Sequence, residues 1–255
     1  MFDPKKLLDD LLGSQVPGTK TSVRDGAGKA AQMAKDNPLA AGALVAVLLG
    51  TKTGRSVTGK AATIGGLAAI GGLAYQAYKN YQAGKQPAET PQSQPELLPP
   101  PSDTGFHPAN APQGDAEFAL TLIRAMIAAA KADGHVDDEE RGKIAGKLRL
   151  AGIDTEAEQF LMAELDAPLD LDTLTAAART EEQKVELYTA SRLAIEPDSR
   201  AERGYLDLLA GRLGLPDALV DHVEATVSAA KAPQTVPVGE AQTASAPNPN
   251  VNPRW

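Results

Sequence analysis

Apolar residues recur at helical spacing along residues 115–231, and this pattern predicts a series of helices. From Asp115 to Lys131 the apolar positions cover several sides of the helix, which is typical of a central helix. The later segments each have one apolar stripe, and pairs such as Thr155 with Glu158 have the spacing of a helix start. The pattern predicts an all-α fold, a compact bundle of about seven short helices around a single core.

The predicted bundle contains an internal repeat. A shift of 62 residues aligns Glu140 with Glu202, and Asp137 with Ser199. Asp137 with Glu140 matches a capping box at the start of a helix, and Ser199 with Glu202 matches a second one at the equivalent place. The same shift also aligns Ala132 with Ala194, Arg141 with Arg203, Gly152 with Gly214 and Ile153 with Leu215. Two related helical hairpins are the simplest explanation.

The turn from Lys131 to Arg141 holds five carboxylates in eleven residues. Two interpretations stay open: the acids cap a helix only, or they cap it and also hold a hard divalent cation, Ca²⁺ or Mg²⁺. The candidate metal ligands are Asp133, Asp137, Asp138 and Glu140. Their order differs from that of an EF-hand loop. In the second copy Ile195 replaces Asp133. Glu202 remains there as a candidate ligand, so we expect that second site to be altered or lost.

The first part of the chain has a different composition. Residues 37–85 are rich in Gly and Ala and contain two uncharged runs, 37–51 and 61–78. Small residues recur there at every fourth position, a spacing that lets helices approach closely in lipid. Each run is slightly shorter than the roughly 20 residues that a spanning helix needs. We favour membrane insertion of at least the second run over a flexible or surface-lying segment. Basic residues flank both runs, so the orientation stays open.

Composition divides the chain into five regions. They are a basic amphipathic N-terminal region (1–36), Gly/Ala-rich membrane segments (37–85), a Pro-rich linker (86–114), the helical bundle (115–231) and a disordered tail (232–255). The first region begins with a leucine-faced helix suited to a membrane surface. The linker contains eight prolines, so we expect it to stay extended and to pack no core.

Charge separates the two halves of the chain. Residues 1–85 carry 11 Lys and Arg against 5 acids, whereas residues 115–231 carry 13 against 24. An acidic bundle is repelled by phosphates, which excludes nucleic acid as its partner. The chain contains no cysteine, which excludes disulfides and cysteine zinc sites.

Groups for catalysis do not gather along the sequence. The three histidines, His107, His135 and His222, are far apart. A Walker A spacing begins at Gly54, but Ala61 stands where such a loop needs Ser or Thr for magnesium. Arg124 and Arg192 lie in apolar helices, where we expect them to pair with acids. The sequence therefore predicts a protein that is not an enzyme.

A family resemblance rests on these residues. Lys131–Gly134 with Glu140, weakly repeated around Glu202, resembles the helical domain of the TerB tellurite-resistance superfamily. The Gly/Ala-rich stretch resembles the YebE-like bacterial inner-membrane proteins. The resemblance implies an all-helical bundle, attachment to the bacterial inner membrane and acidic residues linked to metal binding. The side of the membrane on which the bundle lies stays open, and we prefer the cytoplasmic side.

These observations predict a membrane-anchored, non-enzymatic helical binding module with a divalent cation at its acidic turn. The alternative is a membrane scaffold that oligomerises and carries a metal-free domain for protein interaction. The expected partners are the lipid bilayer, an unidentified protein and a second copy bound through small-residue helices. No nucleic acid is expected among them.

Overall fold

The computed structural model describes residues 3–13, 66–87, 98–132, 142, 144–146, 148 and 153–231. Throughout these residues the regular structure is helical and no strand occurs, so the predicted all-α class is confirmed. The helices are α1 (Pro4–Gly13), α5 (Gly66–Gln82), the short 3-10 helix η1 (Pro108–Asn110), α6 (Asp115–Ala130), α8 (Thr155–Asp166), α9 (Leu171–Ala176), α10 (Glu181–Ala194), α11 (Arg200–Leu213) and α12 (Asp217–Lys231). Residues 144–146 are also helical.

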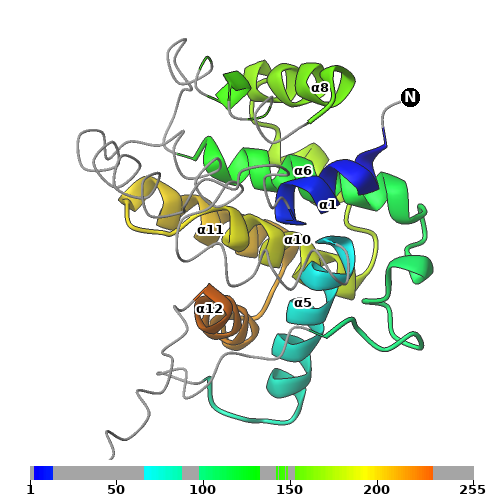
Figure 1. Cartoon of the computed structure of the whole chain (residues 1–255). Helices are drawn as coiled ribbons and strands as arrows, with labels where there is room; N and C mark the ends of the chain where they lie inside the picture. Colours follow the sequence, from blue (N-terminus) through cyan, green and yellow to red (C-terminus); the bar gives the residue numbers. More distant parts are fainter. Residues whose placement is uncertain are drawn as a thin grey trace, which may run out of the picture.

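Helix α10 lies at the centre of the bundle, as Figure 1 shows, and contacts α5, α6, α11 and α12. Thr180 caps its first turn by accepting a hydrogen bond from the amide of Gln183, as the sequence predicts. From Val185 onward every residue of α10 is buried. Helix α6 packs along it and buries Phe118 and Met126, which agrees with its expected central position.

Helix α5 packs against α10 and α12 inside the bundle. Leu67, Ile70 and Leu73 on this helix are buried in the same core cluster as the residues of α10. No helix among the described residues is both long and apolar enough to cross a membrane. The preferred interpretation of residues 61–78 as a membrane segment is therefore not supported, because α5 uses its small residues to approach protein. The prediction for residues 37–51 lies outside the described residues.

Residues 98–106, which we call the strap, cross α5 at Gly71 and Gly72. A Cβ at Gly72 would collide with the carbonyl oxygen of Leu98, so only glycine permits this crossing. The side chain of Phe106 is 3 % exposed. Its ring centroid lies 5.8 Å from that of Tyr75 and 5.4 Å from that of Tyr78.

The expectation that residues 86–114 pack no core is therefore wrong for the strap. The expected extended backbone is also wrong for part of the strap, because the amide of Thr104 donates to the carbonyl of Pro101 and the amide of His107 to the carbonyl of Thr104, which closes two successive turns. The proline content did not indicate that a glycine surface on α5 would receive this segment, where the Phe106 ring reaches two tyrosines of α5. One apolar residue thus anchors the strap to the bundle.

Helix α1 covers another face of the bundle, where it contacts α5 and α6. Leu7, Leu8 and Leu11 form the predicted apolar face and are buried against protein. The ammonium of Lys5 donates a 2.7 Å hydrogen bond to Asp115 at the start of α6. The leucine face that suggested a membrane surface therefore belongs to the core in this structure.

The two halves of the predicted repeat show matching local geometry. The amide of Ile153 donates to the carbonyl of Leu148 at 3.1 Å, and the amide of Leu215 donates to the carbonyl of Ala210 at 3.1 Å. These two hydrogen bonds are related by the 62-residue shift. The same shift aligns the first residue of α8 with the first residue of α12, so the repeat extends to a third helix in each half.

Candidate functional site

The four predicted ligands of the acidic turn lie outside the described residues. They are Asp133, Asp137, Asp138 and Glu140. Among the residues that the structure does describe, no group of three or more His, Asp or Glu side chains is arranged to hold a metal ion. Glu202 is described, and its place in the second turn can be compared with the prediction.

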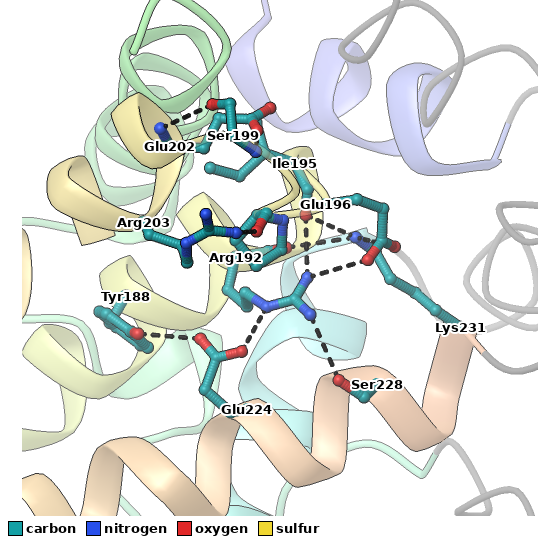
Figure 2. Close-up of polar contacts among 11 residues, drawn as sticks. Tyr188, Arg192, Ile195, Glu196, Ser199, Glu202, Arg203, Glu224, Ser228 and Lys231 are labelled. Carbon is teal, nitrogen blue, oxygen red and sulfur yellow. Dashed lines mark hydrogen bonds and ion pairs between the residues drawn. The ribbon is translucent and has the colours of Figure 1, made fainter. Parts of the chain in front are cut away.

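Glu202 closes a capping box at the start of α11, as the sequence predicts. Its amide donates a hydrogen bond to the Ser199 hydroxyl at 3.1 Å, and its carboxylate accepts a hydrogen bond from the Ser199 amide at 2.8 Å. The guanidinium of Arg203 donates to the carbonyls of Pro197 and Asp198, both at 2.9 Å. This turn is therefore closed by its own side chains (Figure 2).

Two cationic side chains meet at the end of α10, on the same turn. The carbonyl oxygen of Ile195 accepts from Arg192 Nη1 at 2.8 Å and from Lys231 Nζ at 2.9 Å. Lys231 Nζ also donates to the carbonyl of Arg192 at 3.2 Å. The helix C-terminus presents unpaired carbonyls and a partial negative charge, so cations there stabilise it. Figure 2 shows Lys231 reaching this point from α12.

Two glutamates balance these cations. Glu224 on α12 accepts from Arg192 Nε at 2.6 Å and from the Tyr188 hydroxyl at 2.9 Å. Glu196 lies 2.9 Å from Lys231 Nζ and 3.6 Å from Arg192 Nη1. The side chains of Arg192 and Lys231 are 4 % and 5 % exposed. We call Tyr188, Arg192, Glu196, Glu224 and Lys231 the α10–α12 network.

Burial sets the electrostatics of the α10–α12 network. Desolvation, helped by the charge of Arg192, lowers the pKa of Lys231 to about 8, against the opposing effect of Glu196. Burial and the neighbouring Glu224 carboxylate raise the pKa of Tyr188. Every polar group here has a partner within the chain, so the α10–α12 network fixes α12 on α10. Its chemistry is structural.

Sequence reasoning found part of this arrangement. The expectation that Arg124 and Arg192 pair with acids is confirmed, because Arg124 lies 2.8 Å from Glu164 and Arg192 binds Glu224. It missed Lys231, although the signal was present: Lys231 follows the apolar stripe of α12 at helical spacing and so falls on its buried side. Cationic residues near a helix end are usually solvated, which hid its role.

The outer side of α11 is open to solvent. Ala201, Gly204, Leu208 and Gly211 follow one another three or four positions apart and are all exposed. The Leu208 side chain is 48 % exposed. No atom would lie within 4 Å of a Cβ at Gly204 or Gly211. We call these four residues the α11 face, which exposes three small residues and one large apolar side chain.

Comparisons with known proteins give a family without a known activity. A family model described as "Protein of unknown function (DUF533)" matches residues 34–227. A curated relative from Yersinia enterocolitica, "Uncharacterized protein in ampR 5'region", is 36 % identical over 103 residues, which is 40 % of this chain and 74 % of the relative. No solved structure matches the chain. The resemblance to YebE-like proteins is not tested by these matches.

Proposed function

Because the chain belongs to the DUF533 family, whose function is unknown, we propose its function from the structure: a non-catalytic helical module that binds another protein through the α11 face. The observation that carries the proposal is the exposed Leu208 between two uncovered glycines. Small residues on both sides let a partner helix approach closely, and Leu208 supplies an apolar anchor.

The rest of α11 supports this role because it holds the surface rigid. Leu206, Leu209 and Leu213 are buried on the opposite side of the helix. The capping box fixes its start, and Gly214 in the left-handed conformation ends it. A rigid surface loses little conformational entropy when it binds. Covering the exposed half of Leu208 would contribute roughly 1 kcal/mol of binding free energy.

A pair of variants that each introduce a charge tests this function. Leu208→Glu places a charge in the α11 face, and Leu169→Glu makes the same change at a leucine that is 44 % exposed between α8 and α9. We expect wild type and Leu169→Glu to crosslink in cells to the same protein, and we expect Leu208→Glu to form no crosslink to that protein. An identical crosslinking pattern for all three proteins would contradict the proposal. Sedimentation at increasing concentration identifies the case in which the partner is a second copy.

A second candidate function concerns the acidic turn, which we propose as a site for Ca²⁺ or Mg²⁺. The 62-residue shift places Ala130 where Arg192 stands and Leu169 where Lys231 stands. The first turn therefore lacks the equivalents of Arg192 and Lys231, although it keeps Arg141 at the place of Arg203, and it carries more carboxylates. An external cation would supply the missing positive charge.

Calorimetric titration of the full chain with Ca²⁺ and Mg²⁺ tests the cation site. We expect saturable binding that Asp133→Ala weakens and that Glu202→Ala leaves unchanged, because Glu202 serves a helix cap. Equal binding by wild type and Asp133→Ala, or no heat at millimolar ion, would contradict the proposed site.

A further inference from the structure

Glu186 is a buried carboxyl group that the proposed function does not use. It lies on α10 and its residue is 2 % exposed. It faces the crossing between α5 and the strap. A Cβ built on Gly71 would lie 2.8 Å from Glu186 Oε1 and 2.6 Å from the carbonyl oxygen of Phe106. Two oxygen atoms, one from α10 and one from the strap, thus approach the same glycine.

The neighbours of Glu186 that the structure describes offer it no positive charge. Glu182 lies one turn earlier on the same helix and packs against Gly105 of the strap. α5 presents Gly71, and the strap presents the Phe106 carbonyl and the Pro100 ring. Among the described residues, Glu182 is the charged group that acts on Glu186. Burial first, and then the charge of Glu182, raise the pKa of Glu186 well above its ordinary value.

An ionised Glu186 would therefore be strongly disfavoured in this position. Its carboxylate would lie near a carbonyl oxygen, which is also an acceptor, and near a second carboxylate. A buried charge without a donor or a counterion is costly. A protonated carboxyl has one O–H donor, and the Phe106 carbonyl is an acceptor on the facing side.

We propose that the protonated carboxyl of Glu186 donates a hydrogen bond to the Phe106 carbonyl and holds the strap closed, and that loss of this proton to solvent releases the strap. The strap is the part that moves because Glu186 is fixed within the central helix. Phe106 then leaves the rings of Tyr75 and Tyr78, and the glycine surface of α5 becomes exposed. The strap is thus a cover whose state follows pH.

The direction of the pH response follows from the raised pKa. In the open state solvent reaches Glu186, which then ionises near its ordinary pKa of 4.5, whereas the closed state keeps the proton to higher pH. The closed state is therefore fully favoured at low pH. It loses that advantage as pH rises toward the pKa of the buried group. Release follows once pH exceeds that value.

Amide hydrogen exchange of the full chain, measured across a pH series and corrected for the intrinsic exchange rate, tests the proposal. In wild type we expect strap peptides to lose at least about tenfold protection as pH rises, while peptides of α10 keep theirs. Glu186→Gln cannot ionise, so its strap should stay protected throughout. Protection of the wild-type strap that does not change with pH, or an unchanged response in Glu186→Gln, would overturn the proposal.

Glu182→Gln gives a second test in case Glu186→Gln does not fold. Glu182 is only partly buried, so this change should leave the bundle intact. It removes the charge that raises the pKa of Glu186. The strap should then open at lower pH than in wild type. A midpoint that stays the same or moves to higher pH would overturn the proposal.

Discussion

Arg192 and Lys231 donate to the same carbonyl oxygen, that of Ile195, at 2.8 Å and 2.9 Å. One residue belongs to the central helix α10, and the other ends α12. Like charges meet there because Glu196 and Glu224 neutralise them and because the helix end attracts cations. The relationship ties the last described helix to the centre of the fold, and it makes stability dependent on a buried ammonium group.

Replacing Lys231 by Met should change how stability depends on pH. The folded-state pKa of Lys231 is about 8, below its ordinary 10.5. Between these values the unfolded chain binds the proton and the folded chain does not, so stability rises with pH, by about 1.4 kcal/mol per pH unit at most. We expect the wild-type free energy of unfolding, minus that of Lys231→Met, to rise from pH 8 to 10.5. A difference that is constant or falls would contradict this assignment.

Removing Glu224 should destabilise the fold more than removing Glu164. Glu224 pairs with a guanidinium that is 4 % exposed, whereas Glu164 pairs with the exposed Arg124. Glu224→Ala removes the nearest counterion of the buried Arg192, which keeps only Glu196 at 3.6 Å, and we expect a loss of about 2–4 kcal/mol. Glu164→Ala should cost less than about 1 kcal/mol. Urea unfolding of both variants measures the two values, and equal losses would show that Arg192 is not effectively buried.

A glycine at the crossing of the strap over α5 and an uncovered glycine on α11 should respond differently to substitution by alanine. Gly72→Ala directs a methyl group into the carbonyl of Leu98, so it should destabilise by about 1–3 kcal/mol. Gly211→Ala lies in a helix with nothing within 4 Å, so it should be neutral or stabilise by up to about 1 kcal/mol. Thermal unfolding compares them. A neutral Gly72→Ala would mean that the strap does not press on α5.

The helix cap of α11 predicts a loss that a second substitution restores. Ser199→Ala removes the acceptor for the Glu202 amide, and we expect a loss of about 1 kcal/mol. Ser199→Asp keeps an acceptor at the cap and should retain most of the stability. If the two variants unfold at the same denaturant concentration, the capping box does not contribute to the stability of this helix.

Sequence reasoning was most successful where periodicity and capping act locally. The apolar spacing of 115–231 gave the all-α class, and Ser199 with Glu202 gave the start of α11. The pairing of Arg124 and Arg192 with acids was also predicted correctly, because a buried guanidinium needs a counterion, although the sequence did not identify Glu164 and Glu224 as the partners. Periodicity and capping depend on neighbours within a few turns, so a single sequence contains their signal.

The use of the Gly-rich segment could not be predicted in the same way. Small residues at every fourth position permit close approach whether the neighbour is a helix in lipid or a strap in a core. Which neighbour Gly71 and Gly72 meet depends on contacts with Phe106 and Leu98 at distant positions. Glu186 was missed for the related reason that a single glutamate in α10 gives no sign of facing a glycine on α5.

The central claim is that α5 belongs to the same core as α6 through α12. The most direct test compares the thermal unfolding of residues 1–231 with that of residues 115–231, which lack α1, α5 and the strap. Because α5 packs on both α10 and α12, the longer protein should unfold in one cooperative transition, and the shorter one at a much lower temperature or without cooperativity. Equal midpoints and equal cooperativity would contradict the account.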